Sequence, residues 1–467
     1  IGSEVIKKRL ADIFYKEENF KKALDNYKFY LKSKRNKYNK DLYIKIIYCF
    51  YNLKKYEEGS KYVLTCLKNS AEFSTEALLL FGNIFLKSKK YEKAIEQFLN
   101  GIQTIAEYLK KIENLSYTSE KNNEINKEKF LEAAKFSCPQ FLFPKFLNNI
   151  GNAYNKIGNY SEAQKYLTKA ISLEKNPYTL NNLALSLKAQ GKKNDALNHL
   201  LNAIQIEPKS AKIYFNLAEI YLSMNDINNA QKFLNETINL DPSHEGAKLK
   251  SEILNRNFKG KIPIKYLEHH FDDYSETFEK HLLGTLHYKV PLVFSKIIKS
   301  KYEKNYLIKN ILDLGCGTGL CGIQITNKFN KFVGVDISKQ MLNKANQKSI
   351  YTQLICSDII NFLKFTKQKY EIIMAADVLI YLGDLTELFK FVHNTMLNNA
   401  RFIFSIEETK KGEYEINQSG RFSHSLYYII NISQQNNFII ETSQDIKIRK
   451  ENNKCINGKI FTIMKNQ

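Results

Sequence analysis

The sequence lacks the long apolar runs and the leader segment that mark membrane and secreted proteins. Its 467 residues contain no apolar run of membrane-spanning length, which is about 18 residues for a helix. The first residues, Ile-Gly-Ser-Glu, include neither an initiator methionine nor the charged and apolar blocks of a signal peptide. We therefore expect no membrane partner, and a start that was trimmed or carries residues left by cloning.

Cysteine is scarce, and its spacing is uninformative. No Cys-x-x-Cys pair and no Cys/His cluster is present, and the seven cysteines lie apart in apolar surroundings: Cys49, Cys66, Cys138, Cys316, Cys321, Cys356 and Cys455. Zinc sites and disulfide frameworks need closely spaced or evenly paired cysteines. We expect neither a metal nor a disulfide, and a reducing cytoplasmic location fits best.

Arginine is also rare, although the net charge is +22. Of the 70 basic residues only six are arginines: Arg9, Arg35, Arg256, Arg401, Arg421 and Arg449. A strongly basic chain could attract nucleic acid or an anionic membrane. However, proteins that read phosphates and bases favour the forked guanidinium of arginine. We interpret the charge as a solvated lysine surface and expect no specific nucleic-acid partner.

One glycine-rich stretch is the most informative part of the chain. Residues 311–314 read as a short buried strand, and Gly315, Gly317 and Gly319 follow it directly. Glycines at such a point allow a tight turn and let a ligand approach the bare backbone. Residues 320–329 can continue as a helix, whose first N–H groups would be free to bind a ligand.

Two carboxylates indicate which ligand the glycine stretch binds. Asp336 ends the next expected strand, at 332–336, and could accept both hydroxyls of a ribose. Asp313, just before the glycines, suits a cationic ligand better than a pyrophosphate, which it would repel. This pattern resembles the S-adenosylmethionine site of class I methyltransferases. An NAD-type dinucleotide fold is the alternative, because it shares the glycine pattern.

The first half of the chain is a repeat array. Small residues recur at one position of each unit, with one exception at Ile47: Ala11, Gly82, Gly151, Ala184 and Ala218. A large residue follows three positions later: Phe14, Phe50, Phe85, Tyr154, Leu187 and Tyr221. Another small residue follows nine beyond that: Ala23, Gly59, Ala94, Ala163, Ala196 and Ala230. The successive steps are 36, 35, 69, 33 and 34 residues.

A period near 34, with two helices per unit and small residues where they cross, resembles the tetratricopeptide repeat. We expect about six repeats over residues 3–243, with an insertion near 103–145, and a capping helix at 244–257. Within the insertion we favour a loop followed by a helix over 128–136, and a degenerate repeat is the alternative. Such arrays form a superhelix whose groove commonly binds a protein or peptide. Alternatively, the array serves only scaffolding or dimerisation.

The second half alternates strand and helix, which predicts a parallel α/β sheet. A linker is expected at 258–263 and a catalytic domain at 264–467, beginning with helices that close over the ligand. Strands are expected near 310–314, 332–336, 352–356, 371–376 and 401–406, and a closing antiparallel hairpin at 437–445 and 458–465. The fold class is therefore a helical tetratricopeptide superhelix followed by a Rossmann-like methyltransferase domain with a seven-stranded sheet.

Three further segments strengthen the family resemblance: Phe271–Tyr274, Ala375–Asp384 and Ser419–Ser425. They resemble the bacterial predicted methyltransferases that carry tetratricopeptide repeats. The resemblance implies S-adenosylmethionine as cofactor, held by the glycine stretch and by Tyr274, Asp313, Asp336, Met341, Asp358, Ile359 and Ala376. It places Asp358 on the adenine amino group, whereas the structural alternative for Asp358 is a helix N-cap.

The acceptor is less constrained than the cofactor. Methyltransferases acting on adenine or glutamine carry Asn/Asp-Pro-Pro-Tyr after the fourth strand, and this chain has Ala-Ala-Asp-Val at 375–378. Asp377, Tyr381, Arg421 and His424 are the polar residues expected on the acceptor side. His424 could take a proton, or it could be a buried, hydrogen-bonded histidine.

Three functions remain open at this point. The leading hypothesis is a methyltransferase whose repeats recruit a protein or peptide. The alternatives are a small-molecule methyltransferase whose repeats serve assembly, and an adaptor with a degenerate enzyme domain. The intact glycines and both carboxylates stand against the adaptor.

Overall fold

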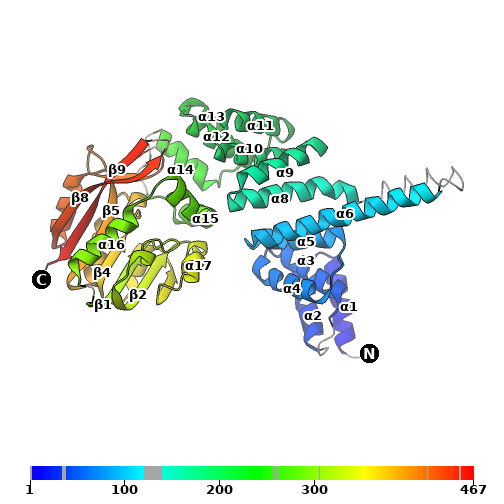
Figure 1. Cartoon of the computed structure of the whole chain (residues 1–467), viewed down its shortest axis with the longest axis horizontal. Coiled ribbons are helices and arrows are strands. Elements are labelled where there is room, and N and C mark those ends of the chain that lie inside the picture. Colours follow the sequence, from blue (N-terminus) through cyan, green and yellow to red (C-terminus); the bar gives the residue numbers. More distant parts are fainter. Residues whose placement is uncertain are drawn as a thin grey trace. The chain divides into compact units, whose positions relative to one another are not determined.

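The computed structural model describes residues 3–33, 38–119, 139–255, 258, 261–303, 305–417, 419–451 and 454–466 (Figure 1). The chain divides into two compact units, Ile1–Met224 and Asn225–Gln467. The first is helical and the second contains the sheet. In the part of the chain that is described, no helix is both long and apolar enough to cross a membrane.

The first unit is a series of helical hairpins. Its helices are α1 (Ser3–Lys16), α2 (Phe20–Ser33), α3 (Lys40–Asn52), α4 (Tyr56–Asn69), α5 (Thr75–Lys87), α6 (Tyr91–Ser119), α8 (Phe143–Ile157), α9 (Tyr160–Leu173), α10 (Pro177–Ala189), α11 (Lys193–Ile206) and α12 (Ala211–Ser223), with one 3-10 turn at Pro139–Leu142. A methyl group on Gly82 would lie 2.2 Å from the Phe98 ring, and one on Gly151 would lie 2.4 Å from the Leu167 side chain. The predicted small residues therefore lie where the helices of a hairpin cross.

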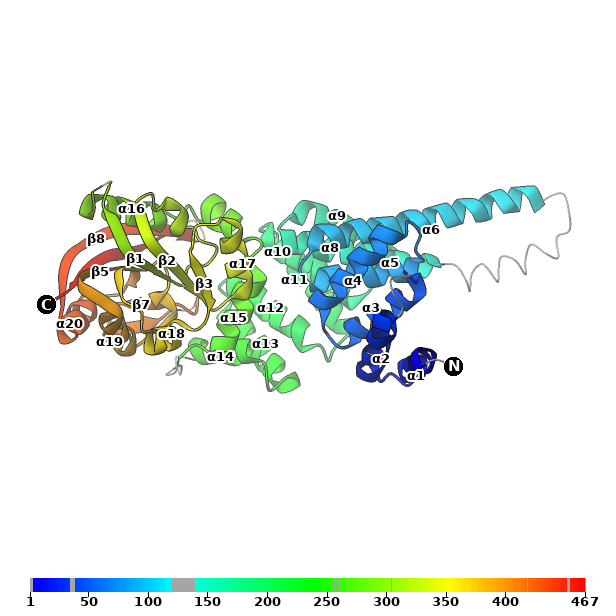
Figure 2. The same cartoon turned by 90° about the horizontal axis from the view of Figure 1, so that it is seen from below.

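The insertion begins differently from the prediction. Helix α6 continues without a break through residues 103–119, where the sequence favoured a loop, and Figure 2 shows it running past its neighbours α5 and α8. The helix predicted at 128–136 lies outside the described residues. Gly101 on α6 lies against the Phe146 ring of α8, where a methyl group would be only 2.4 Å away. Stacking of the hairpins therefore continues across the insertion.

A strip of asparagine side chains joins the first helices of successive hairpins. Amide-to-amide hydrogen bonds of 2.9, 3.0 and 2.6 Å link α8 to α5, α10 to α8, and α12 to α10, through the pairs Asn149–Asn83, Asn182–Asn148 and Asn216–Asn181. Each carboxamide carries both donors and acceptors, so neighbouring amides can satisfy one another. We call these six residues the asparagine strip.

The second unit has helices on both faces of one mixed sheet. Its helices are α13 (Ile227–Leu240), α14 (Glu245–Leu254), α15 (Ile264–Tyr274), α16 (Val290–Lys301), α17 (Lys339–Gln347), α18 (Ile359–Phe365), α19 (Thr386–Thr395) and α20 (Leu426–Gln435). Its strands are β1 (Leu307–Leu314), β2 (Lys328–Asp336), β3 (Gln353–Cys356), β4 (Tyr370–Ala375), β5 (Met396–Glu408), β6 (Tyr414–Ile416), β7 (Phe422–His424), β8 (Phe438–Glu451) and β9 (Lys454–Lys465).

The strand order confirms the predicted fold class. Strands β3, β2, β1, β4 and β5 are parallel neighbours, β9 adds antiparallel to β5, and β8 adds antiparallel to β9. These are the seven expected strands, including the C-terminal hairpin. Two short strands were not predicted: β7 pairs parallel with the end of β5, and β6 pairs antiparallel with β7. Among the described residues the sheet therefore has nine strands.

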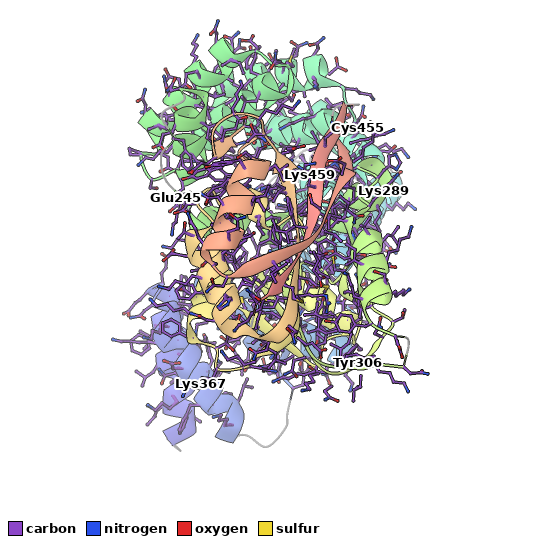
Figure 3. The ribbon with its side chains drawn as sticks, turned by 90° about the vertical axis from the view of Figure 1, so that its left-hand side faces the viewer. Glu245, Lys289, Tyr306, Lys367, Cys455 and Lys459 are labelled. Atoms are coloured by element: carbon purple, nitrogen blue, oxygen red, sulfur yellow. The ribbon has the colours of Figure 1, made fainter. Side chains whose placement is uncertain are left out.

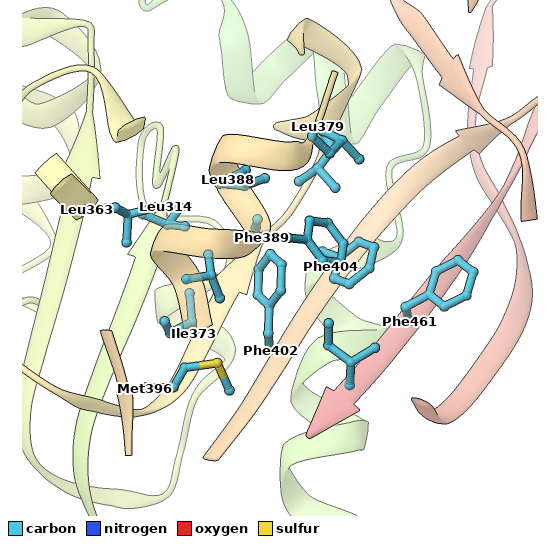
Figure 4. Close-up of a cluster of buried hydrophobic side chains, with 14 of the residues drawn as sticks. Leu314, Leu363, Ile373, Leu379, Leu388, Phe389, Met396, Phe402, Phe404 and Phe461 are labelled. Carbon is cyan, nitrogen blue, oxygen red and sulfur yellow. The ribbon is translucent and has the colours of Figure 1, made fainter. Parts of the chain in front are cut away.

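Apolar side chains alternate between the two faces of the sheet. Leu312 and Leu314 belong to a core that α18, α19 and α20 cover, whereas Ile311 belongs to a core under α16. This alternation follows from the two-residue period of a strand. Figure 4 shows the first core, in which the rings of Phe389, Phe402, Phe404 and Phe461 gather. Figure 3 shows α16, with Lys289 just before its start, on the opposite face from α19 and α20.

The helix predicted at 320–329 is absent. Only one 3-10 turn forms there, at Gly322–Gln324, and β2 begins at Lys328. A methyl group on Gly322 would lie 2.7 Å from the Tyr351 hydroxyl, and the Gln324 carbonyl accepts a hydrogen bond from Ser295 Oγ at 2.7 Å. These contacts leave no room for a regular helix, so the glycine stretch is followed by a turn and not by a helix N-terminus.

Candidate active site

The glycine stretch forms a loop at the C-terminal end of β1. Gly315, Gly317 and Gly319 have φ angles of 64°, 54° and 87°. These left-handed values favour glycine, because other residues are strained there. A methyl group on Gly315 would lie 2.4 Å from the Val378 side chain, which follows β4. The loop therefore needs glycine both for its backbone and for its close approach to the segment after β4.

Asp336 fixes this loop from the end of β2. One carboxylate oxygen accepts the Gly317 N–H and the other accepts the Ser338 N–H, both at 2.8 Å. Burial raises the pKa of Asp336 to about 6. Each oxygen keeps a lone pair beyond its backbone bond. The carboxylate thus both shapes the loop and retains acceptor capacity for hydroxyl donors.

Asp313 lies beneath the loop, on the α16 side of the sheet. Its carboxylate is 1% exposed and accepts a hydrogen bond from the Tyr351 hydroxyl at 2.7 Å. Burial, opposed by the Tyr351 hydrogen bond and aided by the nearby charge of Asp336, raises the pKa of Asp313 to about 7. Tyr351 was not predicted, although the neighbouring Gly322 and Gly334 leave the space that its ring fills.

The segment before β1 that was expected to close over the ligand packs along α17. Three acidic residues bind along α17: Asp272 accepts the Ser338 hydroxyl at 2.6 Å, Glu276 pairs with Lys344 at 2.6 Å, and Glu279 pairs with Lys348. We call residues 264–286 the lid. Its acids recur at helical spacing, and their partners lie at the N-cap of α17, within it and at its C-cap.

The lid presents Phe278, not Tyr274, to the glycine loop. A methyl group on Gly317 would lie 3.7 Å from the Phe278 ring. The Tyr274 ring packs edge-on against Phe278 at 5.2 Å, and its hydroxyl is hydrogen-bonded to the His281 ring. Phe278 lies one helical turn after Tyr274. Extending the predicted helix by one turn would therefore have placed Phe278 on the same face as Tyr274.

The residues predicted around the adenine occupy three different settings. Met341 on α17 is 1% exposed and Ile359 is buried in the sheet core. Asp358 caps α18, because its side chain accepts the Asn361 N–H at 2.9 Å. The N-cap alternative for Asp358 is therefore observed. Ala376 follows β4 directly and is partly buried.

Asp377 is held rigidly at the end of β4. Its φ angle of 55° is left-handed. Ser405 Oγ accepts the Asp377 N–H at 2.8 Å and donates to Asp377 Oδ1 at 3.0 Å, while Arg449 binds Oδ2 at 2.9 Å. Both carboxylate oxygens thus have protein partners, which suits a positioning role better than proton abstraction.

Arg449 is the arginine at the centre of this region, and sequence reasoning overlooked it. It is 3% exposed on β8 and also pairs with Glu407, at the end of β5. The pairing register between β8 and β9 shifts at Ile448, which is one extra residue on β8. Such a bulge re-aims the side chains beside it. Burial raises the pKa of Glu407, whereas Arg449 lowers it.

The two residues predicted from the 419–425 segment differ in accessibility. Arg421 is partly buried next to Gly420, in the β6–β7 loop, and its charge helps to lower the pKa of Glu407. His424 is fully buried, and its Nε2 donates to the Gly383 carbonyl at 3.0 Å. Burial lowers the pKa of His424 to about 4. The buried, hydrogen-bonded alternative therefore describes His424, which is neutral near pH 7.

Comparisons with known proteins agree with this architecture. Residues 311–397 match the methyltransferase domain family, and residues 144–177 and 187–253 match tetratricopeptide repeat families. The chain is 30% identical over 101 residues to the biotin biosynthesis bifunctional protein BioHC of Saccharophagus degradans, covering 21% of this chain and 18% of that protein. It is 35% identical over 85 residues to the TPR repeat-containing thioredoxin TTL4 of Arabidopsis thaliana, covering 18% of this chain and 12% of that protein.

The chain thus spans less than a fifth of the length of each of these curated relatives. Among solved structures, it resembles an S-adenosylmethionine-dependent methyltransferase from Clostridium acetobutylicum, with a TM-score of 0.33 and 19% identity, covering 42% of this chain and all of that one. The family matches agree with the helical hairpins and with the strand order described above. The chain thus contains stretches that match tetratricopeptide repeats and, after them, a stretch within the mixed sheet that matches a methyltransferase domain.

Proposed function

We propose that the chain transfers a methyl group from S-adenosylmethionine to a protein or peptide acceptor that the repeat groove recruits. The observation that carries the cofactor assignment is the pairing of the glycine loop with Asp336. The loop offers bare backbone at the C-terminal edge of β1, and the Asp336 carboxylate stands beside it with lone pairs for ribose hydroxyls. The Phe278 ring covers the loop from the lid side.

The charges around the loop fit a cationic cofactor. Asp313 and Asp336 are both buried there, and no described residue forms an ion pair with either of them. A pyrophosphate would meet repulsion from these carboxylates, whereas a sulfonium and an ammonium would be attracted. When bound, S-adenosylmethionine supplies an activated methyl group on its sulfonium, so the protein needs to align the acceptor and exclude water.

The acceptor side is expected along the loops after β4 and between β6 and β7. Asp377, Tyr381 and Arg421 reach this edge of the sheet, and the Arg449–Glu407 pair fixes the first of them. Because His424 is buried and neutral, proton removal there is not part of this proposal. The acceptor is then a protein amine, thiol or carboxylate that loses its proton to water and needs no general base from this chain.

The repeat unit supports recruitment through the continuity of its first helices. The asparagine strip joins α5, α8, α10 and α12 into one polar face. Stacked arrays of this kind present such a face as a groove for an extended partner. We also propose that the reaction takes place in the cytoplasm, where free cysteines persist.

The decisive test is transfer of radiolabelled methyl groups to a lysate of the source cells, separated into protein and small-molecule fractions. We expect label in protein with the wild type and with the control Asp445→Ala, which removes an exposed carboxylate, and little label with Asp336→Ala. Label confined to small molecules would favour the assembly alternative. Label in neither fraction would favour the adaptor.

Recruitment by the groove can be tested separately by photo-crosslinking. Tyr178 on α10 and Leu173 on α9 are both 53% exposed, and they lie on the first and second helices of their hairpins. We expect p-benzoylphenylalanine at position 178 to crosslink the labelled acceptor and the same group at 173 not to do so. Equal crosslinking from both positions would contradict recruitment through the first helices.

A further inference from the structure

Helix α14 makes an apolar contact with the acceptor side of the sheet unit. Leu249 and Ile253 on α14 form one buried cluster with Ile262 and Phe422, all less than 9% exposed. Residues 258–263 were predicted to be a free linker, yet Ile262 is in the cluster and Phe258 packs against it. The predicted capping helix therefore packs directly on the catalytic unit.

Phe422 transmits this contact to the loop after β4. Its ring occupies the space beside Gly383, where a methyl group would be only 2.8 Å away. The carbonyl of Gly383 in turn accepts the hydrogen bond from His424. One aromatic side chain thus lies between α14 and the segment that follows Asp377 and Tyr381.

The same helix touches the β6–β7 loop directly. Gly420 has a left-handed φ of 81°, and a methyl group on it would lie 3.8 Å from Ile253 Cδ1. Arg421 is the next residue. Any larger residue at 420 would be strained in this backbone and closer still to α14.

Tyr381 is packed by the segment that continues from α14. It borders the α14 cluster, and its ring meets the Phe271 ring of α15 edge-on at 5.3 Å. Lys261, between the two helices, pairs with Glu387 on α19 at 2.8 Å. Helix α14 therefore contacts the predicted acceptor loops at Gly420 and Phe422, α15 contacts them at Tyr381, and Lys261 joins the same segment to α19.

We propose that α14 is a positioning element of the acceptor site, with Ile253 as its key residue. The proposal rests on the proposed function, because it concerns the loops assigned to the acceptor. The cofactor half of the site is supported differently: Asp336 holds the glycine loop, Glu276 and Glu279 hold the lid against lysines of α17 and its C-terminal end, and the α14 cluster contains none of these acids. Loosening α14 should therefore disturb the acceptor loops and leave the cofactor site intact.

The catalytic unit then starts before the expected linker. A cut within 258–263 would remove Leu249 and Ile253 from Phe422 and expose the apolar cluster. A fragment starting at residue 259 should keep the glycine loop and lose the ordered acceptor loops, so small and large acceptors alike should be methylated poorly.

The test uses the full chain with Ile253→Ala and, as a matched control, Ile298→Ala on α16, which removes the same atoms from the opposite side of the sheet. Hydrogen exchange is measured at residues 378–384 and 414–424 and at the glycine loop. Affinity for S-adenosylhomocysteine is measured by calorimetry. Turnover is measured on the acceptor fraction that the lysate assay labels.

We expect Ile253→Ala to speed exchange in the two acceptor segments and to lower kcat roughly tenfold to a hundredfold, the range expected for a misplaced acceptor. The dissociation constant for S-adenosylhomocysteine should stay within about twofold of the wild-type value, since no cofactor contact changes. Ile253→Val should restore most of the turnover. Unchanged exchange in both acceptor segments, or the same change with Ile298→Ala, would overturn the proposal. If the wild type labels nothing, the proposed function fails, and the exchange data still decide whether α14 holds the loops.

Discussion

Replacing Arg449 by methionine tests how the acceptor edge of the sheet is held together. The change keeps an unbranched apolar stem of similar length and removes the guanidinium group with its charge. Asp377 and Glu407 then both lose their cationic partner. Glu407 is 5% exposed, so its charge stays buried with only the Asn417 hydrogen bond and the nearby charge of Arg421 to support it, whereas the Asp377 side chain is 17% exposed and partly screened by water. Removing one partner of a buried pair typically costs about 3–5 kcal/mol.

A second arginine pair in the same sheet supplies the control for this change, because its carboxylate, Glu441, also pairs with Lys301 and keeps a cationic partner. Arg401 binds Glu441 through two hydrogen bonds of 2.9 Å, but both side chains remain more than a tenth exposed. Arg401→Met should therefore cost no more than about 1 kcal/mol. Unfolding of the full chain in urea is monitored through hydrogen exchange at β5 amides, which reports on the sheet unit specifically.

The stability lost in Arg449→Met should depend on pH in a definite direction. Burial raises the pKa of Glu407 above its ordinary value, so this carboxylate takes up a proton at a higher pH in the folded chain than in the unfolded chain. The deficit of Arg449→Met should be largest at neutral pH and should shrink as the pH falls, because the orphaned carboxylate becomes protonated. Adding Glu407→Gln to Arg449→Met should recover much of the loss at neutral pH. A loss below about 1 kcal/mol, or no recovery in the double variant, would refute a buried ionic network.

Three other predictions concern the cofactor half of the site. Gly315→Ala should abolish binding of S-adenosylhomocysteine, as measured by calorimetry. The control Gly191→Ala, at a similar φ with open space around it, should cost only about 1 kcal/mol of stability. Equal losses of affinity and equal falls in Tm for the two variants would contradict the loop's role. Affinity for S-adenosylmethionine should be constant above pH 7 and fall as the pH drops through about 6, since Asp336 accepts hydrogen bonds best when ionised; a titration flat from pH 5 to 8 would exclude it. Tyr351→Phe removes the donor to buried Asp313 and should destabilise the fold by about 1–3 kcal/mol, visible as a lower Tm.

Local patterns in the sequence were sufficient for seven strands of the sheet and for the pairing of the glycine loop with Asp336. Gly315, Gly317 and Asp336 could be predicted because a strand, a tight turn and the next strand end are contiguous in the chain. The repeats were predictable because packing of paired helices requires small residues at fixed spacing, as at Gly82 and Gly151. These signals depend on period and steric fit within short stretches.

Long-range pairings could not be predicted in the same way. Arg449 reaches Asp377 only because β8 carries an extra residue, and a bulge leaves no mark on the hydrophobic alternation. Arg421 was chosen because arginine is rare, which says nothing about where a side chain points. The helix predicted at 320–329 failed because Tyr351, distant in sequence, fills the space beside Gly322. The contact of Ile253 with Gly420 joins segments that only tertiary packing brings together.

The asparagine strip has a consequence for how the repeat unit unfolds. In a stack held only by apolar contacts, terminal hairpins can fray while the middle stays folded, because each unit is coupled weakly to the next. Each amide pair adds a hydrogen bond to the contact between neighbouring hairpins, so a partly frayed state loses this bond together with the apolar contact. Asn182 binds Asn148 across one such boundary, and Asn216 binds Asn181 across the next. The hairpins from α5 to α12 should therefore melt together in one steep transition, and the array should behave as a stiff rod rather than as a string of independently opening units.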